Sequence, residues 1–210
     1  MNAPGSSPCN YPNKMGRIIL LALEEIIERS VVNAVLNQAR LDELINDYPP
    51  ANLDLQFECT ALAAIMTALE SIYGPRGGRG VALRTGRACL KYGLREFGSL
   101  LGLTELTFRL LPLDEKIRFG AEAVAQFFSK VSHQRINLME DEEHFIWNLE
   151  NCPLCWGRHT DSPTCHLTVG LLQEALYWVS GGKFFEVEET ECCGCGDPAC
   201  KIVIAKQPFE

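Results

Sequence analysis

The sequence predicts an α+β fold, with N-terminal helices packed on a small antiparallel sheet and a C-terminal β-β-α-β-β block that contains a metal-stapled hairpin. Three observations lead to this prediction. Apolar residues recur with a helical period up to about residue 132, and they alternate with polar residues after it. Seven of the ten cysteines fall between Cys152 and Cys200. Apolar residues make up 47% of the 210-residue chain, enough for one domain with a substantial core.

The chain divides into a short leader and one domain. Residues 1–13 are rich in Pro, Gly, Ser and Asn, so we expect a mobile N-terminus there. Residues 14–206 are then expected to form a single ligand-binding domain. Its helical part covers residues 14–132, and its β-β-α-β-β, zinc-binding part covers residues 133–206.

The first predicted helix, residues 15–29, has an unusually wide apolar stripe. This width indicates either a plain core helix, which we favour, or a helix that meets a partner chain. Shorter helical pieces follow at residues 31–38 and 41–47 and stop before two prolines. A longer helix is predicted over residues 57–74, with Gly74 as its C-terminal cap.

Glycines mark the next stretch of the chain. The sequence PRGGRG at residues 75–80 is typical of a flexible connector, and it lacks the Lys-Ser/Thr ending of a phosphate-binding loop. A helix is expected over residues 81–102, in which Gly86 and Gly93 lie near one face. Glycines so placed allow the close approach of another helix, or of a ligand. A further helix is predicted over residues 113–133.

The alternating pattern begins after residue 132. The segments RINLME (135–140) and HFIWNLE (144–150) predict two strands. A helix is predicted over residues 166–179. Two apolar runs then flank the turn GCGDPA, which predicts a hairpin over residues 184–205.

Sulfur and carboxylate ligands converge in this predicted hairpin. By the period-two rule, Glu189 shares the inward face of the first strand with Val187, and Cys200 begins the inward face of the second. A buried carboxylate costs roughly several kcal/mol unless it meets a cation or is protonated. Zinc takes about four ligands and favours thiolates. The preferred ligand set for a structural zinc is Cys165, Glu189, Cys192 and Cys200.

Other interpretations of the same cysteines stay open at this stage. Cys155 can replace Glu189, or Cys152 and Cys155 can act together with two of the later thiols. Buried free cysteines are common in cores, and an iron–sulfur cluster would use four thiolates. In a cytosolic chain, cysteines are more often metal-bound or buried than paired in disulfides.

Aromatic residues concentrate late in the chain, around the predicted helix–sheet interface. Such a density is typical of a core, and also of a pocket for a flat apolar ligand. Trp147 is the best single candidate, because the strand pattern turns it inward. The full set of candidate lining residues is Trp147, Phe128, Phe145, Tyr177 and Trp178.

The composition also argues against several function classes. The formal net charge of −8 and the lack of a basic stripe argue against a nucleic-acid partner. No apolar run is long enough for a membrane span, and the N-terminus does not resemble a secretory signal, so we expect a cytoplasmic protein. We find no catalytic signature and predict no catalytic residue. A closed four-ligand metal site is structural rather than catalytic.

The C-terminal third resembles the 4-vinyl reductase domain family, which also provides sensory modules of phenol-responsive activators. The resemblance is carried by a cysteine before a glycine-containing helix, then E-x-x-C, and a second cysteine after a G-D turn. These features fall on Cys165, Gly170, Glu189, Cys192, Gly196, Asp197 and Cys200. The resemblance implies zinc on Cys165, Glu189, Cys192 and Cys200, a hydrophobic ligand cavity and a homodimer. It also implies a fold shared with TRAPP subunits and related to nitric-oxide-sensing domains.

Together these features predict a stand-alone module that binds a small hydrophobic or aromatic ligand, for sensing or delivery, with a structural zinc. The family name suggests an alternative, an enzyme or accessory factor in 4-vinyl reduction of a bacteriochlorophyll precursor. Nothing in the sequence supplies a hydride source, so the binding module is preferred.

Overall fold

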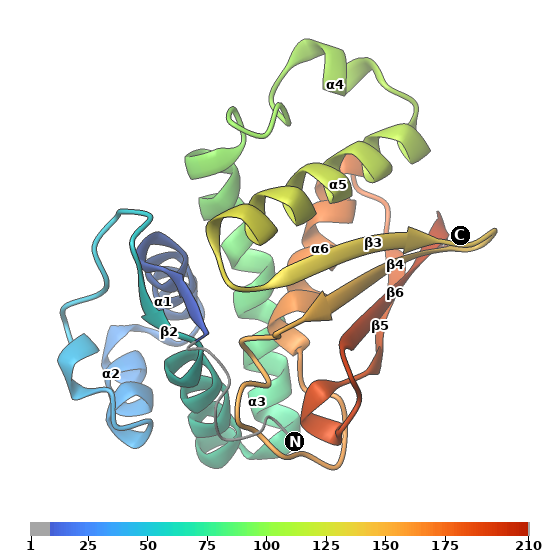
Figure 1. Cartoon of the computed structure of the whole chain (residues 1–210). Helices are drawn as coiled ribbons and strands as arrows, with labels where there is room; N and C mark the ends of the chain where they lie inside the picture. Colours follow the sequence, from blue (N-terminus) through green and yellow to red (C-terminus); the bar gives the residue numbers. More distant parts are fainter. Residues whose placement is uncertain (1–8, 210) are drawn as a thin grey trace.

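The computed structural model describes residues 9–209 (Figure 1). Residues 1–8 of the expected mobile N-terminus lie outside the described residues. Residues 10–12 of that stretch form strand β1 (Asn10–Pro12), and helix α1 (Asn13–Ile27) begins directly after it. None of the helices in the described part of the chain combines the length and the hydropathy that a membrane span needs.

The N-terminal layer consists of α1, α2 (Arg29–Gln38), a 3-10 turn η1 (Asp42–Leu44) and strand β2 (Leu55–Glu58). The wide apolar stripe of the first helix is buried, with Leu20, Ala22 and Leu23 fully inaccessible. This burial is the plain core role that the sequence favoured. The helix predicted at residues 41–47 is reduced to the short turn η1.

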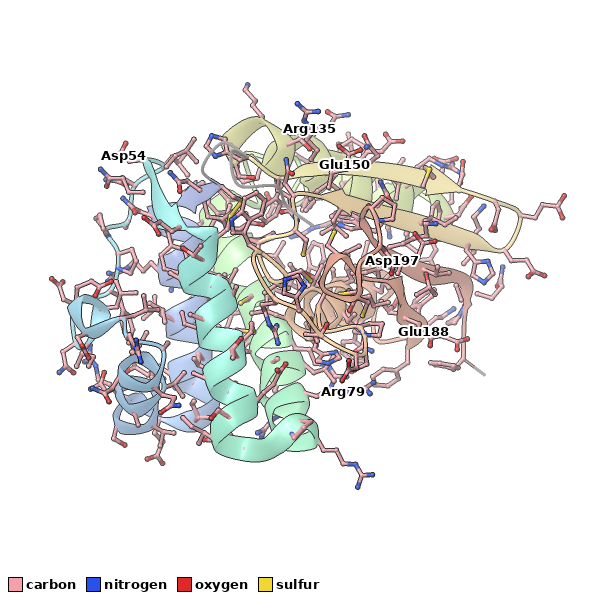
Figure 2. The ribbon with its side chains drawn as sticks, turned by 60° about the horizontal axis from the view of Figure 1, so that its bottom comes forward. Asp54, Arg79, Arg135, Glu150, Glu188 and Asp197 are labelled. Carbon is pink, nitrogen blue, oxygen red and sulfur yellow. A yellow bond between two sulfur atoms is a disulfide. The ribbon has the colours of Figure 1, made fainter. Side chains whose placement is uncertain are left out.

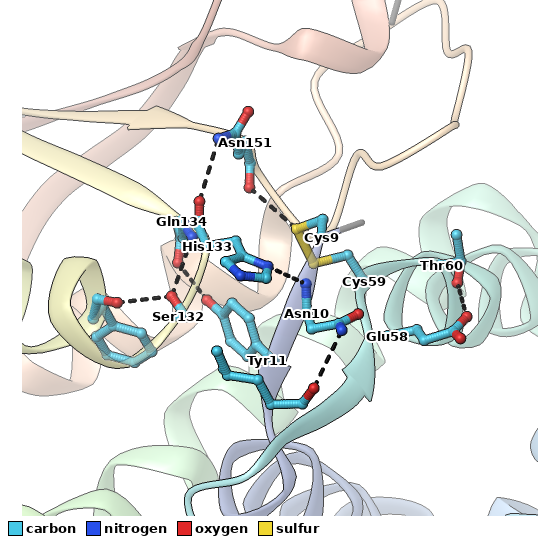
Figure 3. The surroundings of a disulfide bond; sticks show 12 residues. Cys9, Asn10, Tyr11, Glu58, Cys59, Thr60, Ser132, His133, Gln134 and Asn151 are labelled. Carbon is cyan, nitrogen blue, oxygen red and sulfur yellow. Dashed lines mark hydrogen bonds between the residues drawn. A yellow bond between two sulfur atoms is a disulfide. The ribbon is translucent and has the colours of Figure 1, made fainter. Parts of the chain in front are cut away.

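A disulfide joins Cys9 to Cys59 at the edge of this layer (Figure 3). Antiparallel pairing of β1 with β2 brings the two cysteines together, with their Cα atoms 5.4 Å apart. From the sequence we expected metal-bound or buried cysteines rather than pairs. The pattern could not indicate this pair, because the two residues are 50 positions apart and only the sheet pairing aligns them.

Helix α3 (Cys59–Phe97) consists of two helical segments that fold back on each other at Gly74 (Figure 2). Gly74 has a φ of 70°, which glycine adopts at low cost, and Pro75 suits the first turn of the second segment. The expectation of a flexible connector at residues 75–80 is therefore wrong: these residues are helical, and the turn is confined to Gly74.

The second segment of α3 crosses α6 (His166–Ser180) closely. A Cβ atom on Gly86 would lie 2.0 Å from the carbonyl oxygen of Leu167, and one on Gly170 would lie 2.1 Å from that of Leu83. Larger side chains at either position would separate the helices. Gly93 is different, because a Cβ atom there would meet nothing within 4 Å.

The C-terminal part is a four-stranded antiparallel sheet with the order β3-β4-β6-β5. Its strands are β3 (Arg135–Glu140), β4 (His144–Glu150), β5 (Phe185–Glu191) and β6 (Cys200–Pro208). Helix α6 lies between α3 and the sheet, and α5 (Leu113–Val131) packs beside β3 (Figure 1). The short helix α4 (Leu106–Leu110) lies above α5. The predicted α+β class is confirmed.

Candidate metal centre and ligand cavity

Four thiols and one carboxylate meet between the ends of three elements. The ligand atoms of these five buried residues all lie within 4.8 Å of one another. The Sγ atom of Cys155 is the most central: it lies 3.2, 3.3 and 3.6 Å from those of Cys165, Cys192 and Cys200. A tetrahedral zinc with Zn–S bonds of about 2.3 Å holds its sulfur atoms roughly 3.8 Å apart. The thiols are thus gathered at nearly the spacing of a metal–thiolate centre.

Local structure explains why these cysteines converge. Cys155 ends a tight turn after β4, in which its N–H donates to the carbonyl oxygen of Cys152 at 3.3 Å. Cys165 is the residue before the first turn of α6, Cys192 follows β5, and Cys200 opens β6. The β5–β6 turn is shaped by Gly196, which has a φ of 102°. It is also shaped by Asp197, marked in Figure 2, whose carboxylate accepts from the N–H of Cys192 at 2.8 Å.

Glu189 is the buried carboxylate of the group, only 8% exposed. One oxygen, Oε2, accepts a hydrogen bond from the backbone N–H of Cys165 at 2.6 Å. The other, Oε1, is buried without any partner among the described residues. Desolvation, with the nearby Cys192 and Cys155, raises the pKa of Glu189 to about 8. An orphaned carboxylate oxygen beside several thiols is the arrangement that a bound cation would satisfy.

Hydrogen bonds around the thiols fix their positions. The N–H of Cys193 donates to the Sγ atom of Cys200 at 3.3 Å. The N–H of Thr160 donates to the carbonyl oxygen of Gly194 at 2.9 Å, which ties the loop before α6 to the hairpin turn. Such outer contacts orient ligands and raise the affinity of a site for its metal.

Arg158 anchors the same loop to α3. Its guanidinium, 7% exposed, pairs with both carboxylate oxygens of Glu70, at 2.8 and 2.7 Å. Bidentate pairs of this kind are geometrically specific. The loop that carries Cys152 and Cys155 is therefore held from both sides, by the hairpin and by α3.

The residues present fit a metal ion. A closed set of buried thiolates with a carboxylate is a donor set that suits zinc. The structure brings together Cys165, Glu189, Cys192 and Cys200, and adds Cys155 to them. Cys152 lies at the border of the group, with its Sγ atom 3.3 Å from that of Cys165.

A cavity of about 210 Å³ lies next to this centre, between α3, α5, α6 and the sheet. Its lining is almost entirely apolar. A cavity of roughly 150 Å³ with similar walls holds a benzene ring, so this one has room for somewhat more than one ring. The aromatic side chains that line it include Phe97, Phe108, Phe127, Phe128, Trp147 and Trp178.

The structure places the five predicted lining residues differently. Trp147, Phe128 and Trp178 line the cavity. Phe145 is fully buried elsewhere in the core, beneath the side chains of Arg118 and Lys206. Tyr177 is 39% exposed and packs against Phe184 on the outer side of α6.

Several lining residues come from parts of the chain that sequence reasoning did not consider. Tyr11 of β1 lines the cavity, and its hydroxyl donates to Oε1 of the buried Gln134 (Figure 3). Cys89 of α3 also lines it, with a thiol whose pKa burial raises to about 12. Gly93 was noted in the sequence as a point of close approach, and it does face the cavity.

The cavity and the metal centre share a wall. Pro153 and Leu154, between Cys152 and Cys155, both line the cavity, and so does Leu167, two residues after Cys165. These three side chains reach the cavity from the same backbone turns that present the thiols. Any loss of order in the cysteine centre would therefore change the shape of the cavity.

One polar group in the lining lacks a partner among the described residues. The indole Nε1–H of Trp147 is buried and makes no hydrogen bond. A buried donor without an acceptor costs about 1–3 kcal/mol. Trp147 lies in the middle of β4, opposite Leu138 and Ile202. Its unpaired N–H is available to a ligand in the cavity.

The fold and the site define a class of α+β domain with an apolar cavity beside a cysteine-rich centre. Residues 145–206 match the family model of the vinyl-4-reductase domain, which confirms the resemblance to the 4-vinyl reductase domain family. No curated protein matches the sequence.

Solved structures share the fold at low sequence identity. One is the phenol-responsive sensory domain of the transcription activator PoxR with phenol, 19% identical, with a TM-score of 0.53 over 71% of this chain and 74% of that one. Another is the unliganded Fe(II) H-NOX protein from K. algicida, 10% identical, with a TM-score of 0.63 over 95% and 97%. The H-NOX protein from S. oneidensis is 12% identical, with a TM-score of 0.61 over 92% and 98%.

Proposed function

We propose that this chain is a ligand-binding sensory or delivery module, which holds a small hydrophobic or aromatic molecule in the cavity beside its cysteine centre. The observation that carries the proposal is the lining itself: an apolar, aromatic-rich chamber with one unpaired donor, Trp147 Nε1. Apolar walls provide affinity, and a single placed polar group orients the ligand. The likeness to a phenol-responsive sensory domain supports the same function.

The proposal includes a structural zinc, which would hold the shared wall of the cavity. Three thiolates, from Cys165, Cys192 and Cys200, belong to both candidate ligand sets. The fourth position has two candidates. Glu189 offers the orphaned Oε1, whereas Cys155 offers the thiol closest to the other sulfur atoms. The distances favour Cys155, with Glu189 then holding the N–H of Cys165.

The fold likeness to H-NOX proteins makes a heme sensor the second candidate function. Heme iron is held by histidine, cysteine thiolate, methionine or tyrosinate. In the described lining no histidine is present, the Cys89 thiol has a raised pKa, and the Tyr11 hydroxyl is already bonded to Gln134. Burial also raises the pKa of Tyr11 well above its usual value. These features favour an organic ligand over heme.

A thermal-shift titration with aromatic hydrocarbons, phenols and hemin tests this function. A ligand of the folded state raises the melting temperature by mass action, so we expect a saturable rise with one or more aromatics. Hemin should give neither a comparable rise nor a stoichiometric shift of its absorbance. No response to any compound would contradict the proposal, and a stoichiometric hemin complex would favour the second candidate.

A further inference from the structure

The cavity is elongated. Along α5 its lining runs from Lys116 to Phe128, a helical rise of about 18 Å. Along α6 the lining runs over a similar length, from Leu167 to Val179. The ligand space is therefore a channel between helices rather than a compact sphere, and it has two ends of different character.

The first end lies beside the metal centre. There the lining includes Tyr11, Gln134 and Trp147, of which only Trp147 offers a buried donor without a partner in the described chain. This end suits an aromatic ring with an oxygen that accepts a hydrogen bond, or a plain ring at some cost.

The second end lies under α4. Phe108 of α4 packs 5.7 Å from Phe119 of α5 and 6.2 Å from Trp178 of α6, measured between ring centroids. Lys116 belongs to this end, because it lies on the first turn of α5, one helical turn before Phe119.

Lys116 is the only charged residue in the described lining of the cavity. Its side chain is half-buried and forms no ion pair or hydrogen bond with any residue of the part that the structure describes, 9–209. The other lysines in that part either pair with a carboxylate, as Lys14, Lys91, Lys201 and Lys206 do, or are exposed, as Lys130 and Lys183 are. The four-carbon stem of Lys116 can cover apolar surface while its ammonium waits for an anion.

We propose that the natural ligand is an elongated aromatic carboxylate, with its ring at the Trp147 end and its carboxylate at Lys116. The inference rests on the proposed function and names the class of ligand for the same cavity. The ammonium and carboxylate form a charge-assisted hydrogen bond, which is stronger than a neutral one. The apolar walls bind the ring and the alkyl spacer.

The test compares 5-phenylpentanoate with its neutral analogue 5-phenylpentan-1-ol by calorimetric titration of the full chain. We expect the carboxylate to bind roughly tenfold or more tightly than the alcohol. Lys116→Met keeps most of the apolar stem and should abolish this preference, while Lys116→Arg should retain it. Lys130→Met is the matched control, because Lys130 is exposed in the last turn of the same helix. It should leave the preference unchanged.

The outcomes separate the two proposals. If the alcohol binds as tightly as the acid, or if the preference survives in a folded Lys116→Met, the carboxylate assignment is overturned and the ligand-binding function stands. If neither compound binds and no aromatic of the thermal-shift panel binds, both proposals fail. Should Lys116→Met not fold, Lys116→Gln provides the same comparison.

Discussion

At the end of the cavity beside the metal centre, the lining comes from loops whose cysteines are fully buried, whereas at the opposite end it comes from residues 98–112, where three leucines face solvent. Cys165, Cys192 and Cys200 are 0% exposed, and Leu100, Leu106 and Leu110 are 71, 69 and 75% exposed. Sulfur atoms, an ion pair and backbone hydrogen bonds hold the first end. The second end is a five-residue helix held mainly by Phe108.

This difference indicates a division of labour. The cysteine end gives the cavity a fixed shape, because its loop is bound to α3, to α6 and to the hairpin. The α4 end has few buried contacts, and regions of that kind open locally at low free-energy cost. We infer that ligands enter under α4 and are recognised at the cysteine end. The following predictions test this contrast, starting with the largest expected effect.

Removal of a shared metal ligand should have the largest effect. Cys200→Ser takes away a fully buried thiol that belongs to both candidate ligand sets. Because structural zinc contributes folding energy directly, we expect loss of the metal and destabilisation by several kcal/mol, with the scale set by roughly 10–16 kcal/mol for zinc bound to small domains. Metal content and a denaturant unfolding curve measure both.

Cys195→Ser is the control for this variant, because Cys195 lies on the same turn but is exposed and outside the cluster. It should keep the metal and the wild-type stability. Equal loss in both variants, or loss in neither, would contradict a structural role for the metal.

The disulfide should be the next largest contribution. Cys9 and Cys59 are 50 residues apart, and the chain-entropy model assigns a loop of that length about 4 kcal/mol. Cys9→Ser should lower the free energy of unfolding by up to this amount under oxidising conditions. With reductant present, the wild type should match the variant. A wild type that is insensitive to reductant would show that this pair does not form.

The fourth ligand is decided by a pair of variants. If Cys155 binds the metal, Cys155→Ser loses it, while the isosteric Glu189→Gln keeps it and costs only the difference in hydrogen bonding to the N–H of Cys165, about 1–3 kcal/mol. If Glu189 is the ligand, the order of the two effects reverses. Metal stoichiometry of the two purified variants distinguishes these cases.

Filling the cavity should abolish binding without unfolding the protein. Gly93 lines the cavity, and a Cβ atom there meets nothing within 4 Å, so Gly93→Leu should project into the ligand space. Replacing a helical glycine should also stabilise α3 by roughly 0.5–1 kcal/mol. We expect a higher melting temperature and no ligand-induced shift.

Gly80→Leu is the matched control, since Gly80 lies in the same helix with equally open space and does not line the cavity. It should gain stability and still bind. If Gly93→Leu binds ligand as the wild type does, the cavity is not the binding site.

The smallest effect is expected on the outside of α4. Leu110→Ser changes an exposed side chain and should alter the free energy of unfolding by no more than about 0.5 kcal/mol. Phe108→Ala, in the same short helix but 5% exposed, should cost about 3–5 kcal/mol if the end is well packed, and less if it opens easily. Unfolding curves of the two variants measure how firmly this end is closed. A large effect of Leu110→Ser would instead indicate a covered face, as in the homodimer that the family resemblance implies.

Much of the sheet could be predicted from sequence, because alternation is a local signal. The strands at 135–140 and 144–150 begin and end where the pattern placed them. The inward position of Glu189 follows from the same period and agrees with its 8% exposure. The segment 75–80 shows the limit of such reasoning, since glycines and a proline predict a loop. Packing between the two segments of α3 instead makes them helical.

The cavity was harder to predict than the metal centre. Metal ligands are few residue types with restrictive chemistry, so candidate sets could be formed from spacing alone. Cavity walls use ordinary core residues from many elements. The aromatic count pointed to Phe145 and Tyr177, which lie elsewhere, and it missed Tyr11 and Lys116, which only the tertiary arrangement brings to the cavity. The pairing of Cys9 with Cys59 likewise depends on strand pairing and leaves no local sequence signal.

The central claim is that a metal ion on the buried cysteines holds the wall of the ligand cavity. Elemental analysis of reduced, desalted protein tests it most directly, with free thiols counted in the same sample. We predict about one zinc per chain, bound so that the clustered thiols do not react until a chelator removes it. Protein that is folded and binds ligand, yet contains no metal and shows freely reactive cluster thiols, would contradict the account.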